Sequence, residues 1–495
     1  MERAAGILLS VSSLPSAYGI GTLGRAAYDF IDFLAAAGQK YWQMLPVGPI
    51  SYGDSPYQPF SAFAGNPYYI DLDMLIEDGL LTGQEAASAF WGGDLRRVDY
   101  GAVYESRFAL LEKAFERGWD RDGWAVAAFS EKNHDWLDDY VLFMALKRHF
   151  GMAAWTDWPQ TDIRLREPAA VAYWRAQLDR DVRFFTYLQF LFQKQWDAMK
   201  AYAAQKDVEL IGDLPIYVSM DSADVWANPQ NFLLDGENIP TAVAGVPPDA
   251  FTADGQLWGN PLYDWERMAA DGFTWWQARI RRTLERFDVA RLDHFRGLES
   301  YWAVPYGDPT AATGHWEPGP GDAFIRMLHE KFSEHLIIAE DLGYLTPEVR
   351  ALLKSSGFPG MKVLQFAFDH REPSDYLPHR YPVNCVCYTG THDNNTLRGW
   401  MGEVDPRDLA FARRYLGLNR VEGFDWGILR GGMGSVARLF VAQMQDYLGL
   451  DAQGRMNTPG NPVGNWQWRM LPDEAAPELA ERIHRLTALY GRLAR

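Results

Sequence analysis

Short apolar runs that end in acidic residues recur along the chain, and they give the first indication of its fold. Residues 289–292 have the side chains of a buried parallel strand, with Arg291 inside the run and Asp293 directly after it. Because successive strand residues face opposite sides, Arg291 and Asp293 share one face. Charges buried together are costly unless they are paired or used. Taken alone, this stretch is equally consistent with a structural ion pair that fixes a strand end.

Three further segments follow the same pattern, at residues 208–213, 336–340 and 385–393. Segments of helix length lie between them, as in repeated βα units. In a (β/α)8 barrel the active site lies at the carboxyl ends of the strands and draws its residues from several of them. The pattern therefore predicts an α/β protein with a (β/α)8 barrel, in which four carboxylates converge on one pocket: Asp213, Asp293, Glu340 and Asp393.

The remaining strands of the barrel are predicted from the same reading. We expect barrel strands at residues 5–11, 41–45, 208–213, 289–292, 336–340, 361–366 and 385–388, and loosely near 438–446. A helical period over residues 28–37 stops at Gly38, a normal position for a helix end.

The spacing between these strands predicts the domain organisation. Residues 1–495 are expected to form a single catalytic barrel, with insertions at roughly 51–207, after the second strand, and 216–288, after the third. We predict that these large insertions are mainly helical and form the walls of a substrate cleft. No long β-rich tail follows the eighth strand, so no C-terminal β-domain is expected.

Composition narrows the function. A net charge of -18 argues against nucleic acid as a partner, which needs a basic footprint, and against an anionic membrane. Aromatic residues make up 14% of the chain and include 20 Trp, which suits rings that pack on the C–H faces of sugars. An aromatic-rich core would give the same composition.

The two cysteines, Cys385 and Cys387, lie two apart on one predicted strand. They make neither a disulfide framework nor a zinc site, which favours a reducing, cytoplasmic location. Residues 4–11 follow a segment that is not net basic, so they read as a barrel strand and not as a signal peptide. No apolar run reaches the roughly 18 residues of a membrane helix. No metal-binding cluster is evident, so we expect no metal and no cofactor.

A nucleotide-binding alternative comes from residues 19–24, which match G-x-G-x-x-G. The dinucleotide motif should follow a strand at once, but Pro15 and several polar residues intervene. The acidic residue expected about 20 positions further on is also missing. A glycine-rich loop that lets the backbone approach the pocket is the better interpretation.

Four motifs taken together resemble a known family: Gly212-Asp213 and residues 291–294, 339–341 and 391–394. They look like the barrel motifs of the α-amylase clan, and their residues most resemble those of the 4-α-glucanotransferases called amylomaltase or disproportionating enzyme. Further matches are residues 54–57, 66–68, 245–261 and 464–466. The resemblance spans nearly the whole chain in the family's order, and that family lacks the C-terminal β-domain of typical amylases.

The resemblance implies a retaining transfer in which Asp293 is the nucleophile, Glu340 the acid/base and Asp393 the stabiliser of an oxocarbenium-like transition state. Arg291 is expected to keep Asp293 ionised, because a nearby cation lowers the pKa of a carboxyl group. For Asp213 and the histidines, a structural hydrogen-bonding role stays open. The substrate-binding residues implied are Tyr57, Asp213, Asp249, Phe251, Gln256, Trp258, Arg291, His294, Asp369, His370, His392 and Asn465.

The resulting hypothesis is an enzyme that moves 4-linked α-glucan segments between maltooligosaccharides. The alternative within the same clan is an α-1,4-glucan hydrolase, in which water takes the place of the acceptor sugar. A non-catalytic glucan-binding protein would account for the aromatic residues and leave the acidic motifs unexplained. The expected partners are therefore maltooligosaccharides and α-1,4-glucans, without nucleic acid or membrane.

Overall fold

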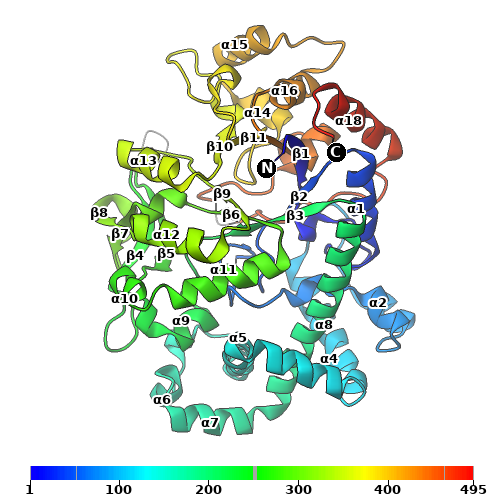
Figure 1. Ribbon diagram of the computed structural model, residues 1–495. Coiled ribbons are helices and arrows are strands. Elements are labelled where there is room, and N and C mark those ends of the chain that lie inside the picture. The colour runs from blue at the N-terminus through cyan, green and yellow to red at the C-terminus, as the bar shows by residue number, and fades with distance from the viewer. Residues whose placement is uncertain (1, 52, 249–252, 462, 494–495) are drawn as a thin grey trace.

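A ring of parallel strands forms the centre of the computed structural model, which describes residues 2–51, 53–248, 253–461 and 463–493 (Figure 1). The strands are hydrogen-bonded in the order β10-β11-β12-β1-β2-β3-β6-β9. The amide of Ala339, the last residue of β9, donates to the carbonyl of Pro359, directly before β10, at 2.9 Å. This hydrogen bond joins the two ends of the sheet. Their bounds are β1 (Ala4–Leu8), β2 (Tyr41–Gln43), β3 (Glu209–Leu214), β6 (Val289–Leu292), β9 (Leu336–Ala339), β10 (Gly360–Val363), β11 (Cys385–Tyr388) and β12 (Leu439–Gln443).

Helices follow the strands and cover the outside of the barrel, so the predicted (β/α)8 fold is confirmed. Each of the eight strands overlaps its predicted range, although β1 and β10 begin one residue earlier and β3 ends one residue later than predicted. The first helix ends where expected, and Gly38 directly beyond it has a left-handed φ of 66°. These helices are α1 (Arg25–Ala36), α11 (Thr274–Arg286), α12 (Gly321–Phe332), α13 (Pro347–Ser356), α14 (Leu397–Glu403), α15 (Pro406–Leu416), α16 (Phe424–Met433), α17 (Met444–Leu448) and α18 (Pro477–Leu489).

The residues between β2 and β3 are mostly helical and lie on one side of the barrel, at the bottom of Figure 1. The two longest helices, α5 and α8, pack against each other, and α8 then leads into β3. The helices of this insertion are α2 (Leu72–Glu77), α3 (Gly83–Ala87), α4 (Tyr100–Gly118), α5 (Gly123–His149), α6 (Thr161–Arg164), α7 (Pro168–Gln177) and α8 (Asp179–Gln205).

A small antiparallel sheet stands beside the barrel, and the insertion after β3 contributes strands to it as well as helices. Its strand order is β5-β4-β7-β8. The first two strands come from the insertion after β3, but the other two follow β6, so two separate insertions build one wall. These strands are short and are bounded by Pro and Gly, so the alternation of polar and apolar residues that would predict them is too brief to recognise in the sequence. The strands are β4 (Ala242–Val246), β5 (Gln256–Pro261), β7 (Ser300–Pro305) and β8 (His315–Pro318), with helices α9 (Ala223–Ala227) and α10 (Trp265–Ala270) nearby.

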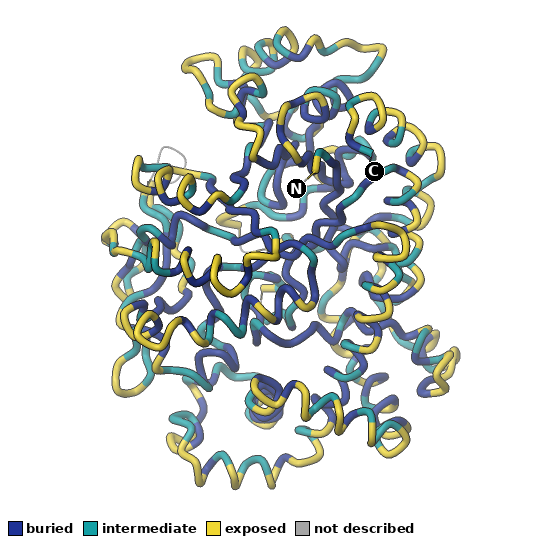
Figure 2. Tube along the Cα trace, viewed as in Figure 1, coloured by how far each residue is buried: buried dark blue, intermediate teal, exposed yellow. Residues whose placement is uncertain are grey.

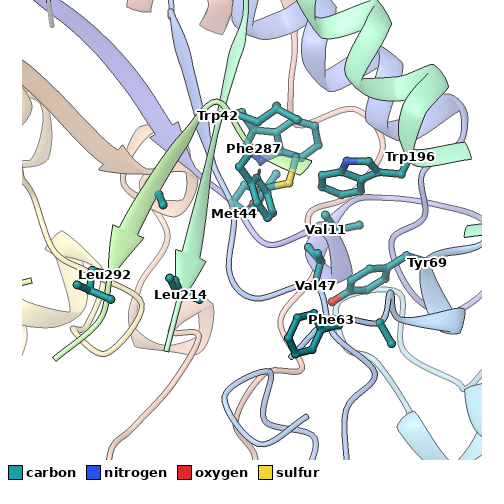
Figure 3. Packing of buried hydrophobic residues seen from close by; sticks show 14 of the residues in the cluster. Val11, Trp42, Met44, Val47, Phe63, Tyr69, Trp196, Leu214, Phe287 and Leu292 are labelled. Atoms are coloured by element: carbon teal, nitrogen blue, oxygen red, sulfur yellow. Dashed lines mark hydrogen bonds between the residues drawn. The ribbon is translucent and has the colours of Figure 1, made fainter. Parts of the chain in front are cut away.

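Alternation along the barrel strands separates two cores. Side chains such as Ile211, Val289 and Ile338 form a cluster inside the barrel, whereas Leu210 and Ala290 belong to the larger core between strands and helices. Figure 2 shows the buried residues gathered in and around the barrel, and Figure 3 shows part of the larger core. Strand side chains alternate between the two faces, so every second residue points into the barrel. At the ends of the strands, the inward-facing positions are occupied by charged residues.

The described part of the chain after β12, residues 444–461 and 463–493, contains helices and no strand. Among the described residues, we find no helix with the length and apolarity needed to cross a bilayer.

Candidate active site

A buried guanidinium group organises the mouth of the barrel. Arg291 on β6 lies opposite Asp213 on β3 in the strand register. Its Nη1 atom donates to both carboxylate oxygens of Asp213, at 2.6 and 2.7 Å, and to Asp293 at 2.9 Å. The Arg291 and Asp213 side chains are 4% and 0% exposed, whereas Asp293 keeps 25%. The Asp213 carboxylate is therefore buried in the ion pair with Arg291, whereas the Asp293 carboxylate reaches the opening of the barrel.

Glu340 lies beside Asp293 because the two residues end neighbouring strands. The amide of Asp293 donates to the carbonyl of Leu214, and that of Glu340 to the carbonyl of Leu292, each at 3.0 Å. The Glu340 carboxylate accepts two backbone N–H bonds, from His294 at 2.8 Å and from Leu342 at 2.7 Å. Its partner His294 directly follows Asp293, so one short segment positions both acids.

The conformation of His294 makes this contact possible. Its backbone is left-handed, with φ 49° and ψ 49°, which is uncommon for a residue other than Gly. Such strain persists where the surrounding structure enforces it, often at functional sites. Here it turns the His294 amide toward Glu340. Burial, followed by the neighbouring Arg296, lowers the pKa of the His294 side chain to about 3, so the ring is neutral.

The third acid, Asp393, comes from the loop after β11 and is 46% exposed. Its carboxylate accepts a hydrogen bond from Asn457 Nδ2 at 2.6 Å and lies 3.3 Å from His392 Nε2. Burial works in the opposite direction, but His392 and Asn457 together lower the pKa of Asp393 to about 2. Asp393 in turn raises the pKa of His392, against the effect of burial. This carboxylate is thus ionised throughout the neutral range.

Aromatic rings surround these acids. Tyr57 stacks on His392 with ring centroids 4.8 Å apart and 21° between the planes. Its hydroxyl donates to Asp213 at 2.7 Å and lies 3.1 Å from His392 Nδ1. Trp466 is tilted against Tyr57 at 5.7 Å. On the other side, Trp258 meets the His294 ring edge-on at 4.8 Å. The site therefore offers the flat apolar surfaces that pack on sugar rings.

The electrostatics of Asp293 differ from the sequence-based expectation. Arg291 does lower the pKa of this carboxyl group, but burial outweighs it, and Asp213 and Glu340 add to the effect of burial. The net result raises the pKa of Asp293 to about 7. The expectation failed because it counted the cation and omitted the desolvation and the two like charges nearby.

Other residues predicted to bind substrate have different surroundings. Gln256 on β5 accepts a hydrogen bond from Trp258 Nε1 at 3.2 Å. The side chain of Asn465 bonds to Thr458 and Asn461 of its own loop. Asp369 accepts a hydrogen bond from Arg371, and His370 contacts Asp408 of α15. Neither residue takes part in the hydrogen bonds that hold the three acids. Asp249 and Phe251 lie outside the described residues.

Sequence reasoning missed two residues of the Asp393 environment. Asn457 holds the carboxylate, and Arg455 Nη2 donates to the Asp393 carbonyl at 2.7 Å. Both lie more than 60 positions further along the chain, in a polar turn segment without strand or helix character. Nothing in that segment's composition relates it to the barrel, so only the fold brings it to the site.

A (β/α)8 barrel with three acids at the carboxyl ends of β6, β9 and β11, surrounded by aromatic rings, has the arrangement of an enzyme that cleaves or transfers glycosidic bonds. Comparison with known proteins defines it further. A family model for 4-alpha-glucanotransferase matches residues 9–474. The 4-alpha-glucanotransferase of Clostridium butyricum is 47% identical over 488 residues, which cover 98% of this chain and 100% of the relative. That of Thermus thermophilus is also 47% identical, over 504 residues and the full length of both chains. This chain therefore belongs to the 4-alpha-glucanotransferase family.

Solved structures agree with this assignment. An amylomaltase from Streptococcus agalactiae, in complex with acarbose, superimposes with a TM-score of 0.97 at 39% identity, and each chain covers 100% of the other. An amylomaltase from Corynebacterium glutamicum has the same fold at 20% identity, with a TM-score of 0.78 over 99% of this chain and 75% of that one. The barrel enzyme is thus a glucanotransferase, and the predicted family and activity are confirmed.

Proposed function

We propose that the enzyme transfers 1,4-α-glucan segments between maltooligosaccharides with Asp293 as nucleophile and Glu340 as acid/base. Asp293 attacks the anomeric carbon of the donor while Glu340 protonates the departing glycosidic oxygen, which leaves a covalent glycosyl-enzyme. Glu340, now ionised, takes the proton from the 4-hydroxyl of an acceptor glucan, and that oxygen displaces Asp293. Donor and product keep the α configuration because two inversions occur.

The observation that carries this proposal is the joint positioning of the two acids. Asp293 and Glu340 end adjacent strands, and the His294 amide, one residue from Asp293, binds Glu340 at 2.8 Å. A nucleophile and an acid/base must lie about 5–5.5 Å apart in a retaining enzyme, so they need supports that share one rigid frame. Hydrogen bonds from neighbouring strands supply that frame.

The remaining side chains of the site hold the sugar. Asp393, ionised at neutral pH, is placed to bind ring hydroxyls and to stabilise positive charge at the anomeric carbon. His392 and His294 border the same opening, and Tyr57 and Trp258 offer faces for stacking. Asp213 acts through Arg291 and Tyr57. Gln256 and Asn465, with Asp369 and His370, would contact glucan further from the reacting bond.

An experiment with maltotriose tests the reaction. Transfer produces a ladder of longer and shorter oligosaccharides, whereas a hydrolase only shortens its substrate. Asp293→Asn, Glu340→Gln and Asp393→Asn should each lower the rate by several orders of magnitude without loss of fold. The exposed Glu317→Gln serves as a control for a lost surface carboxylate.

A donor with an activated leaving group separates the two central roles. With 4-nitrophenyl maltoside, departure needs little protonation, so Glu340→Ala should release nitrophenol in a burst and accumulate glycosyl-enzyme, visible by mass spectrometry. Asp293→Ala should show neither. A burst in the Asp293 variant would show that another group forms the covalent bond. We further propose a reducing, cytoplasmic location, which fits the buried free thiols of Cys385 and Cys387.

A further inference from the structure

A small cavity that Asp213 helps to line contains an unusual set of charges. It has a volume of about 40 Å³ and lies between helix α11, the end of β3 and the segment after β2. Three arginines of one helix line it, Arg279, Arg282 and Arg286, spaced so that they share one face. They are only 2%, 7% and 4% exposed. Apolar wall residues Val47, Leu214 and Phe287 are drawn in Figure 3.

Arg286 is the least satisfied of the three. Its Nη1 donates to the carbonyl of Ala64 at 3.1 Å, but neither Nε nor Nη2 has a hydrogen-bond partner among the described residues. Nε of Arg279 is likewise unpartnered there, although its other nitrogens reach backbone carbonyls. A buried guanidinium with unmade hydrogen bonds is costly.

Carboxylates do not offset this charge from within the cavity. Asp213 also lines the space, but both of its oxygens accept from Arg291. Arg282 pairs with Glu285 at 3.2 Å, and that carboxylate is 48% exposed. Asp224, behind Arg279, accepts from the Ala62 amide, and burial raises its pKa to about 6. Burial and then the Arg282 charge lower the pKa of Arg286, and these effects outweigh the opposing effects of Glu285 and Asp197. The Arg286 guanidinium also lies 5.3 Å from the centroid of the Phe192 ring, a contact that supplies none of its missing hydrogen bonds.

We propose that this cavity is a binding site for a small inorganic anion of the chloride type, held by Arg286 with Arg279 and Arg282. A water molecule needs about 10–15 Å³ of such space, so a cavity of about 40 Å³ is large enough to hold one halide ion. The anion would complete the hydrogen bonds of Arg286 and neutralise charge directly behind the strand that carries Asp213.

Bromide tests the site because it replaces chloride and scatters X-rays anomalously. Crystals of the wild-type enzyme grown without halide and then soaked in sodium bromide should show an anomalous peak within hydrogen-bond distance of Arg286 Nη2. Arg286→Met should abolish that peak. The matched control is Arg281→Met, which removes an exposed arginine from the same helix and should retain it. Only water density in the wild-type cavity would overturn the proposal.

Thermal unfolding gives an independent readout in solution. At constant ionic strength, replacement of gluconate, too large for the cavity, by chloride at about 100 times Kd should raise Tm by about 2–3 °C for a chain of this length. The increment should persist in Arg281→Met and vanish in Arg286→Met. If Arg286→Met does not fold, Arg282→Gln takes its place, and the rise in Tm with chloride should be smaller in that variant than in the wild type. An equal chloride response in wild type and Arg286→Met would refute the assignment.

Discussion

A substitution of Arg291 gives the sharpest test of how the site controls the ionisation of Asp293, the proposed nucleophile. The Arg291 Nη1 atom contacts Asp293 at 2.9 Å and Asp213 at 2.6 Å. The substitution Arg291→Met removes the cation and retains most of the side-chain volume. In the wild type the pKa of Asp293 is about 7, and the nucleophile must be ionised to react. We therefore expect kcat/KM to rise with pH through about 7 in the wild type, and through a higher value in the variant.

The distances set the size of the shift. At an effective dielectric constant of about 20, unit charges 2.9 Å apart interact by about 6 kcal/mol, or about four pKa units. Solvent screens part of this interaction, because the Asp293 side chain is 25% exposed. We expect a net rise of about two units. At pH 7 the variant would then be about 50-fold slower in kcat/KM, and the deficit would shrink at alkaline pH.

The assay is glucose release from maltotriose, measured as kcat/KM from pH 5 to pH 10 for wild type, Arg291→Met and Arg291→Lys. The Arg291→Lys variant keeps the positive charge and loses part of the hydrogen-bonded contact. The pH at which its kcat/KM rises should therefore stay near that of the wild type. Circular dichroism checks the fold of each protein. A uniform loss of activity in Arg291→Met, with the acid limb unmoved, would refute electrostatic control by Arg291 and leave it a structural ion pair.

Three further substitutions test separate parts of the structure. Asn457→Ala removes the 2.6 Å hydrogen bond to Asp393 and should cost about 1.5–3 kcal/mol of transition-state binding, a fall of about 10- to 150-fold in maltotriose kcat/KM with little change in Tm. Gly212→Ala places a methyl group 2.2 Å from the Phe287 ring and should destabilise the fold by about 1–3 kcal/mol in urea unfolding. Burial raises the pKa of Asp446 to about 7. Between roughly pH 4 and 7 the folded protein therefore holds a proton that the unfolded chain has lost, so the free energy of unfolding falls as the pH rises through that window. Asp446→Asn should remove this slope, and a stability curve parallel to that of the wild type would contradict it.

The barrel could be predicted from sequence because its strands are short apolar runs with a fixed orientation. Once residues 289–293 are read as a strand, alternation places Arg291 and Asp293 on one face, and parallel pairing brings Glu340 to the same end. The wall formed by β4, β5, β7 and β8 could not be predicted in the same way. Its pairing joins segments from two insertions, and such long-range partners leave no periodic signal in either one.

The pKa of Asp293 was mispredicted for a different reason. Sequence identifies which charge is adjacent, but burial depends on the whole surrounding fold, and here burial has the larger effect. The contact of Asn457 with Asp393 has the same origin, because a polar turn gains its role only from where the chain folds back. Residue types at strand ends are therefore readable from sequence, whereas their protonation depends on surroundings that only the structure supplies.

The site holds each of its three acids with a different kind of donor, and this explains how chemically similar groups can act differently. A guanidinium that is shared with Asp213 binds Asp293, two backbone amides bind Glu340, and a neighbouring histidine and asparagine bind Asp393. The pKa of Asp393 falls to about 2, while that of Asp293 rises to about 7. Environments that separate titrations in this way assign roles within a cluster of carboxylates. In the proposed mechanism, Asp393 is consequently a permanent negative charge for the transition state, and Asp293 is the nucleophile, with an ionisation that depends on Arg291.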